Sequence, residues 1–243
     1  MAHLYYVDPD VHLSTGTTVS LTGDEARHAA SVSRVRVGEQ VKLSDGRGTL
    51  AEAHITAIAK NDVTLRVLSV AAVEKQCPQL VLVQALAKAD RDERAIEAAT
   101  EIGVDTVIPW QAERSVSRWD DVKRAKGQQR WESIVREASK QSIRAWRPDV
   151  AAMITSTDLP AGTKTSVVLA LDPRGKESLS SLSLDHAERI SVIVGPEGGI
   201  SEGEIERLQQ AGAHVVSMGE LVLRTSTAGP AALAVLQARL GRW

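Results

Sequence analysis

The sequence predicts an α/β protein in two parts, and three observations lead to this prediction. The first 73 residues alternate short β-forming segments with turn residues, whereas the chain after residue 78 alternates apolar runs with helical segments. Residues 74–78 between them have the composition of a linker. Alternating strands and helices are typical of a mostly parallel sheet covered by helices. We therefore expect a compact β-barrel over residues 1–73 and an α/β domain over residues 78–243.

The N-terminal part contains four β-forming segments and one helical candidate. Its turns are predicted at Asp45-Gly46, at Gly48 and at Asn61-Asp62, because glycine, asparagine and aspartate favour the backbone angles of tight turns. The strands are expected at residues 19–21, 40–43, 50–58 and 63–70, and the helix at residues 23–34.

The C-terminal part contains five apolar runs that alternate with helical segments. Gly103 is placed to end the first of these helices, and Ser201 with Glu204 has the spacing of a capping box at the start of the third. Pro230 precedes the last helix, where a first turn tolerates proline. The strands are expected at 80–86, 106–110, 166–171, 189–194 and 214–218, and the helices at 91–102, 122–143, 202–211 and 231–240.

Composition excludes several classes of protein. The chain has 243 residues, of which 43% are hydrophobic, and no phenylalanine, so its cores are expected to consist of Val, Leu, Ile and Ala. The net charge of −2 predicts neither a nucleic-acid nor a membrane partner. Cys77 is the only cysteine, and the six histidines lack zinc-ligand spacing, so we expect neither a disulfide nor a metal. Without a leader or a long apolar run, the protein is expected to be cytoplasmic.

The charge is distributed unevenly along the chain. Residues 114–147 contain ten lysines and arginines against four aspartates and glutamates. Such a basic stretch is typical either of a surface that faces phosphates or of an ordinary solvated helix face, and the sequence leaves both interpretations open.

The loop at residues 195–199 is the first candidate site. It follows the apolar run 190–194, contains three glycines and one carboxylate, Glu197, and leads directly into a helix. Neither the dinucleotide-binding pattern of glycines nor a P-loop is present. We expect a ligand that is flat and polar but carries no phosphate, such as an adenosine with a cationic tail.

The loop at residues 220–230 is the second candidate site, and it contains Arg224. If both loops follow parallel strands, both emerge at the carboxyl edge of the sheet, where open α/β sheets bind ligands. Arg224 is therefore either a surface residue or a functional residue beside specially shaped backbone.

Together these residues resemble a known family. Gly195-Pro196-Glu197-Gly198-Gly199 and Leu223-Arg224-Thr225-x-Thr227-Ala228 resemble the C-terminal signature of the SPOUT superfamily of RNA methyltransferases. Within that superfamily the chain resembles the methyltransferase E family, which methylates uridine N3 in small-subunit (16S) ribosomal RNA. The resemblance covers nearly the whole chain and includes Arg27-His28, residues 33–38, Glu113-Arg114-Ser115, Gln141-Ser142-x-Arg144 and residues 171–174.

The resemblance implies a fold and partners that periodicity does not predict. The N-terminal part is expected to be a PUA-like barrel that holds RNA, and the C-terminal part a SPOUT domain with a deep trefoil knot. The knot brings loops 169–174, 220–227 and 195–200 together around S-adenosylmethionine. The resemblance further implies a homodimer, whose active sites are completed by the partner subunit, and a small ribosomal subunit as the substrate.

The resemblance also assigns roles to residues. Arg224 is expected to stabilise the uracil anion, and Glu197 either acts as the base or only hydrogen-bonds loop N–H groups and cofactor. The expected cofactor-binding residues are Leu171, Gly195, Pro196, Glu197, Gly198, Gly199, Ile200, Met218, Gly219, Leu221, Leu223, Arg224 and Thr225. The expected RNA-binding residues are Arg27, His28, Arg34, Arg36, Arg114, Arg144 and Arg174.

Two places depart from the family, and one is the N-terminus, which reads Ala2-His3-Leu4-Tyr5-Tyr6 where an arginine is common among relatives. Ser226 stands between Thr225 and Thr227, where relatives usually carry glutamate. Two alternatives to uridine-N3 methylation stay open. One is ribose 2′-O-methylation of RNA within the same superfamily, and the other, which the Ser226 departure allows, is a non-catalytic RNA-binding assembly factor.

Overall fold

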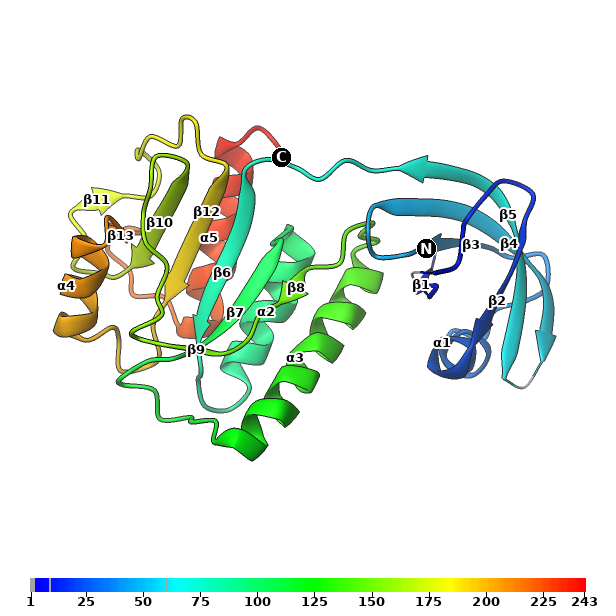
Figure 1. Ribbon diagram of the computed structural model, residues 1–243, viewed down its shortest axis with the longest axis horizontal. Coiled ribbons are helices and arrows are strands. Elements are labelled where there is room, and N and C mark those ends of the chain that lie inside the picture. The colour runs from blue at the N-terminus through cyan, green and yellow to red at the C-terminus, as the bar shows by residue number, and fades with distance from the viewer. Residues whose placement is uncertain (1–2, 9, 60) are drawn as a thin grey trace. The chain divides into compact units, whose positions relative to one another are not determined.

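The computed structural model describes residues 3–8, 10–59 and 61–243. These residues form two compact units (Figure 1). The first unit contains the chain up to Lys75 and also Ser139–Arg147, and the second contains Gln76–Ala138 and Pro148–Trp243. A segment from the middle of the chain therefore belongs to the N-terminal unit. No helix of the described residues is long and apolar enough to cross a membrane.

The first unit is built on one five-stranded sheet. Its two long strands carry shifts of register between Glu52 and Ala53 and between Ile55 and Ala57, which are typical of bulges that bend a sheet. Val19, Leu43, Ile55 and Leu65 contribute to its buried core. The strands, in spatial order, are β1 (Leu4–Tyr6), β3 (Gln40–Ser44), β4 (Thr49–Ala59), β5 (Asp62–Ala72) and β2 (Thr18–Thr22).

The structure corrects the prediction of a closed barrel. Strands β1 and β2 lie at opposite edges of the sheet and do not pair with each other within the described residues, so the sheet is a half-barrel. Ala26 and Ala29 pack into its core. They belong to α1 (Gly23–Arg27) and to the π-helical turn η1 (His28–Val32). The helix predicted over 23–34 ends earlier, because Arg34 adopts a left-handed φ of 51°.

The segment Ser139–Arg147 packs against this half-barrel. The Nζ atom of Lys140 lies 3.5 Å from Glu25 Oε1 in a buried ion pair. The indole N–H of Trp146 donates to the carbonyl of Val73 over 2.7 Å, and the Trp146 ring lies against Gly48. A Cβ at Gly48 would stand 2.5 Å from that ring, and Gly48 has a φ of +103°, so only glycine fits there.

The second unit is a parallel sheet, as predicted. All of its strand pairs are parallel, and β12 pairs with β10 on one side and β6 on the other. The spatial order is β11 (Glu177–Ser178), β13 (His214–Ser217), β10 (Ser166–Leu171), β12 (Arg189–Val194), β6 (Gln79–Ala85), β7 (Thr106–Gln111) and β8 (Asp149–Val150), with β9 (Ile154–Thr155) also on β7. The two-residue strands β8, β9 and β11 were not predicted.

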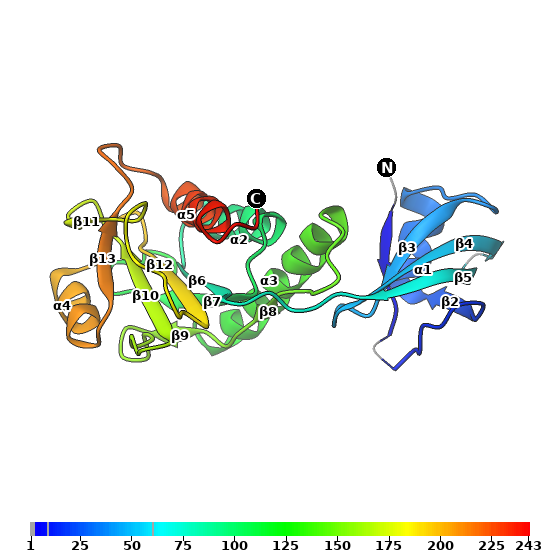
Figure 2. The same cartoon turned by 90° about the horizontal axis from the view of Figure 1, so that it is seen from above.

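Helices cover both faces of this sheet (Figure 2). On one face, α2 (Arg91–Ile102), α5 (Thr225–Arg239) and the Trp131 turn of α3 (Asp121–Gln141) share a core with alternate residues of β6 and β12. On the other face, α4 (Glu202–Gln210) packs with the remaining residues of the same strands. The capping box at Ser201 and Glu204 and the left-handed Gly103 after α2 are both confirmed.

Two further helix boundaries differ from the prediction by two residues or more. The helix expected over 122–143 ends at Gln141. The last helix begins at Thr225, six residues before the predicted start, and Pro230 lies inside it. Proline was taken as a start signal because it cannot donate to the preceding turn. Packing outweighs that loss, since Gly229 and Pro230 are buried and a Cβ at Gly229 would lie 2.9 Å from Leu82.

Candidate active site

Three strands end at the same edge of the second sheet and place three loops side by side. Because β13, β10 and β12 run parallel in that spatial order, the loops that follow them leave the same edge. These loops begin at Asp172, Gly195 and Met218. The predicted placement at the carboxyl edge is thereby confirmed for loop 195–199 and for residues 220–224, whereas residues 225–230 belong to α5.

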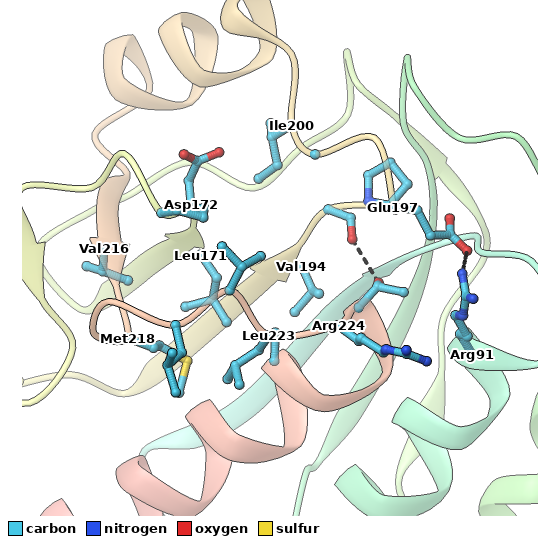
Figure 3. A pocket seen from close by; sticks show the side chains of 18 of the residues that line it. Arg91, Leu171, Asp172, Val194, Glu197, Ile200, Val216, Met218, Leu223 and Arg224 are labelled. Atoms are coloured by element: carbon cyan, nitrogen blue, oxygen red, sulfur yellow. Dashed lines mark hydrogen bonds and ion pairs between the residues drawn. The ribbon is translucent and has the colours of Figure 1, made fainter.

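A cavity of about 440 Å³ lies between these loops and the start of α5 (Figure 3). Its wall is largely apolar, and its charged groups are two carboxylates and two guanidiniums: Asp172, Glu197, Arg91 and Arg224. The volume falls in the range of small-molecule sites. The apolar side chains of the wall include Leu171, Val194, Ile200, Val216, Met218 and Leu223.

Gly195, at the start of the glycine-rich loop, lies close to Ile200 at the end of the same loop. A Cβ at Gly195 would stand 2.7 Å from the Cγ1 of Ile200 and 3.1 Å from the Ile200 backbone nitrogen. A larger residue at position 195 would therefore push Ile200 out of the cavity wall. The tight turn keeps the backbone of the loop at the cavity surface, where a ligand can reach it.

A buried chain of hydrogen bonds joins the loop to the last helix. The Oγ1 of Thr225 donates to the carbonyl of Gly195 over 2.8 Å and accepts from the Nε2 of Gln84 over 2.9 Å. Gln84 belongs to β6 and is fully buried. This chain fixes the first residue of α5 against the loop, and with it the position of Arg224.

Arg224 stands at the N-cap of α5 with an exposed side chain. Its guanidinium makes no hydrogen bond or ion pair with any residue that the structure describes. The guanidinium is therefore available to a ligand, while the backbone on both sides of it is held in place by the helix and the loop.

Asp172 and Arg174 tie the first loop to the glycine-rich loop. The carboxylate of Asp172 accepts from the Nε of Arg174 over 2.8 Å and from its Nη2 over 2.9 Å. The same Nη2 also donates to the carbonyl of Ile200 over 3.0 Å. Burial of Asp172 acts to raise the pKa of its carboxyl, but the hydrogen bonds from Arg174 outweigh it and hold this pKa below its usual range.

Glu197 makes an equivalent contact at the other end of the cavity. Its Oε1 accepts from the backbone N–H of Lys88 over 3.0 Å and from the Nη1 of Arg91 over 2.8 Å. Burial acts to raise the pKa of Glu197, but backbone hydrogen bonds and the Arg91 guanidinium lower it overall. Glu197 therefore stays ionised near neutral pH and links the glycine-rich loop to the start of α2.

The sequence 113–115 lies against the outside of the glycine-rich loop. Arg114 donates through Nη1 to the carbonyl of Gly198 over 3.2 Å. The carboxylate of Glu113 accepts from the hydroxyl of Ser201 over 2.6 Å and also contacts Arg207. This loop therefore supports the backbone that lines the cavity.

Comparison with known proteins identifies the family. A model of the RNA methyltransferase domain matches residues 74–237, and a model of the RNA methyltransferase PUA domain matches residues 21–68. Ribosomal RNA small subunit methyltransferase E of Mycobacterium bovis is 40% identical over 250 residues, which cover all of this chain and 94% of that protein. The chain belongs to the methyltransferase E family. The resemblance found in the sequence is confirmed.

Other members of the methyltransferase E family agree with this assignment. The Bacillus subtilis protein is 31% identical over 228 residues, which cover 90% of this chain and 89% of that protein. The crystal structure of the Neisseria gonorrhoeae methyltransferase E, bound to S-adenosyl methionine, matches with a TM-score of 0.87 and 29% identity. That match covers 98% of each chain, so the architecture of this chain is that of the family.

The structure brings most of the expected cofactor residues of this family member together. Of the thirteen residues, all except Gly198 line the cavity. The expected RNA-binding residues divide between the two units. Arg114 and Arg174 belong to the second unit and bond to the glycine-rich loop, whereas Arg27, His28, Arg34, Arg36 and Arg144 belong to the first.

Sequence reasoning did not single out three residues of the site, although one of them, Asp172, lies in the expected loop 169–174. Arg91 and Asp172 line the cavity, and Gln84 supports it from below. Asp172 directly follows the carboxyl end of β10, so the rule that predicted the two loops would also have indicated it, whereas Arg91 is separated from the end of β6 by several residues. Gln84 gave no such signal, because it stands inside an otherwise apolar run.

The Asp172–Arg174 pair predicts a pH-dependent contribution to stability. Asp172→Asn is expected to lower the free energy of unfolding by about 1–2 kcal/mol at pH 7, because Arg174 is half exposed and only part of its charge-assisted bonding is lost. The folded-state pKa of Asp172 is lowered. The contribution is therefore full above the unfolded pKa of about 3.9 and is lost as the pH falls through the folded pKa.

Urea unfolding of both proteins at pH 7, 5, 4 and 3 measures this difference. The gap between wild type and Asp172→Asn should be the same at pH 7 and 5 and should shrink below about pH 4. A gap of constant size down to pH 3 would show that the ionised carboxylate does not stabilise the loop.

Proposed function

We propose that this protein transfers the methyl group of S-adenosylmethionine to ring N3 of a uridine in 16S ribosomal RNA, with the assembled small subunit as substrate. One observation carries the proposal: the free guanidinium of Arg224 stands at a cavity bounded by the glycine-rich loop. The chain's membership of the methyltransferase E family, and the S-adenosyl methionine bound by its Neisseria gonorrhoeae member, support the same function.

The cavity suits S-adenosylmethionine in its chemistry. Its apolar wall offers a surface for a flat adenine ring, and the ionised carboxylates of Asp172 and Glu197 favour a ligand with cationic groups. Gly195 and its neighbours offer backbone groups to the ligand. The residues proposed to hold it are Leu171, Gly195, Pro196, Glu197, Gly198, Gly199, Ile200, Met218, Gly219, Leu221, Leu223, Arg224 and Thr225.

Arg224 is proposed to be the catalytic residue. When bound, S-adenosylmethionine supplies an electrophilic methyl group. Uracil N3 still holds a proton at neutral pH, and when this proton passes to solvent water it leaves negative charge on the two neighbouring carbonyl oxygens. The guanidinium of Arg224 is a cation that presents several N–H donors, so it stabilises this anion by charge and hydrogen bonds. The Gln84–Thr225–Gly195 chain positions Arg224 in advance, so that no reorganisation is needed.

Glu197 could act as the general base or could only hold the glycine-rich loop through hydrogen bonds. Its contacts favour the holding role. A general base at neutral pH needs a pKa near 7, whereas the pKa of Glu197 is lowered below its usual range. Its Oε1 is also occupied by the N–H of Lys88 and the guanidinium of Arg91. We therefore assign Glu197 to holding the glycine-rich loop in place.

The first unit is proposed to bind RNA through shape and phosphate contacts. It matches the PUA domain of RNA methyltransferases and contains Arg27, His28, Arg34, Arg36 and Arg144. Arginines paired with phosphates position a protein on folded RNA without reading its sequence. Arg114 and Arg174 of the second unit are proposed to contact RNA beside the cavity, with part of their donor capacity committed to the loop.

The family resemblance supports two further structural proposals. The chain leaves β13 beyond β10 and returns to pack α5 against β12 and β6, a path compatible with threading the C-terminal segment into a trefoil knot. Leu221 and Val222 are 83% and 77% exposed beside the cavity. Apolar side chains so exposed fit a homodimer in which the partner subunit covers them and completes the site.

Labelled methyl transfer tests the proposed function. Small ribosomal subunits from cells that lack this gene are incubated with the protein and labelled S-adenosylmethionine, and the digested RNA is analysed by mass spectrometry. Label in 3-methyluridine is expected. Label in a 2′-O-methyl nucleoside would overturn the assigned reaction, and no label together with no cofactor binding would favour a non-catalytic assembly factor. Naked 16S ribosomal RNA, compared in the same assay, shows whether assembly is required.

Replacement of Arg224 tests its role in that assay. Arg224→Ala is expected to lower kcat about 100- to 1000-fold with an unchanged unfolding temperature, because the variant loses a preorganised donor to the uracil anion. Arg189→Ala, which removes an exposed arginine at the opposite edge of the sheet, is the matched control and should keep full activity. Near-normal turnover by Arg224→Ala would remove Arg224 from the mechanism.

A further inference from the structure

Arg91 is a second cationic group at the same end of the cavity as Arg224. It is the first residue of α2 and lines the cavity, although it comes from a part of the sequence far from the three loops. Figure 3 shows Arg91 and Arg224 at one end and Asp172, Val216 and Met218 at the other. If uracil is methylated beside Arg224, Arg91 lies at the same end of the cavity as the target nucleotide.

The contacts of Arg91 leave most of its donors available. Its Nη1 donates to the Oε1 of Glu197 over 2.8 Å, and the side chain remains 35% exposed. A guanidinium carries five N–H donors, and within the described residues Arg91 uses only those on Nη1 in a hydrogen bond. The remaining donors form a planar edge that suits an oxyanion.

The backbone before Arg91 is strained, and Glu197 holds it. Ala89 and Asp90 have φ values of 53° and 56°, in the left-handed region that such residues rarely adopt. The N–H of Lys88, immediately before them, donates to the same Oε1 atom that accepts from Arg91. Strained backbone of this kind persists where the surrounding contacts impose it, and it is concentrated at functional sites. One carboxylate thus fixes both the turn and the side chain that follows it.

We propose that Arg91 binds a phosphate oxygen of the target nucleotide, and that Glu197 is its positioning residue. The proposal rests on the proposed function, since it places the nucleotide by reference to Arg224. Arg91 would bind an oxyanion in either of two ligands: a phosphate of the nucleotide or the carboxylate of S-adenosylmethionine. The phosphate is the assigned source because Arg91 is partly exposed and lines the same cavity as Arg224.

Separate measurements of cofactor binding and of methylation kinetics test this assignment. S-adenosylmethionine affinity is measured by calorimetry, and KM and kcat for small subunits are measured by labelled methyl transfer, for wild type, Arg91→Ala and Arg91→Lys. Arg94→Ala is the matched control, because Arg94 is an exposed arginine on the same helix that does not line the cavity. Unfolding temperatures establish that each variant is folded.

We expect Arg91→Ala to change KM for small subunits but not the affinity for S-adenosylmethionine. Arg91→Ala should raise KM for subunits at least tenfold while its S-adenosylmethionine affinity stays within about twofold of wild type. The dependence of log KM on log salt should flatten by about 0.7–0.9, as for the loss of one phosphate contact. Arg91→Lys should restore part of the KM effect, because it keeps the charge without the planar edge.

Glu197→Gln should raise KM for subunits by a smaller factor and leave the salt dependence unchanged, since Arg91 is misplaced but still present. A purely structural role of Glu197 would instead lower the unfolding temperature without moving KM. If Arg91→Ala weakens S-adenosylmethionine binding tenfold with KM for subunits unchanged, the oxyanion is the cofactor's carboxylate and the assignment is wrong. Wild-type values of both S-adenosylmethionine affinity and KM for subunits in Arg91→Ala would also overturn the assignment. Absence of 3-methyluridine in the wild-type reaction would contradict the proposed function instead.

Discussion

The hydrogen bonds from Gln84 through Thr225 to the carbonyl of Gly195 join the parts of the site that are farthest apart in the sequence. Gln84 lies near the end of β6, the first strand of the second unit, Gly195 follows β12, and Thr225 begins the last helix. Because all three groups are buried or partly buried, each unmade bond would cost about 1–3 kcal/mol. The helix start, the glycine-rich loop and the central strand therefore keep one arrangement, and Arg224 is fixed by it.

Two arginine–carboxylate pairs complete this arrangement at opposite ends of the cavity. Arg174 holds Asp172 and the carbonyl of Ile200, and Arg91 holds Glu197. Each pair keeps its carboxylate ionised, so the cavity presents fixed charges rather than groups that exchange protons near neutral pH. In the proposed reaction, the uracil anion is therefore stabilised by the positive charge of Arg224, which is already held in position.

The sequence predicted the parallel sheet, the capping box at Ser201 and the two loops at its carboxyl edge, because these depend on short-range patterns. It placed the start of the last helix at residue 231 instead of Thr225, since the burial of Gly229 and Pro230 against Leu82 depends on contacts distant in sequence. The half-barrel was taken for a closed barrel, because strand patterns do not determine whether edge strands meet. Gln84 and Arg91 were missed because their partners lie more than 100 residues away.

The central claim is that the cavity between the three loops binds the methyl donor. A crystal structure of the protein grown with S-adenosylmethionine tests it most directly. We expect the cofactor between residues 171–173, 195–200 and 218–225, in contact with the thirteen residues proposed to hold it. A cofactor bound elsewhere on the chain, or a cavity that stays empty at saturating cofactor, would contradict the account.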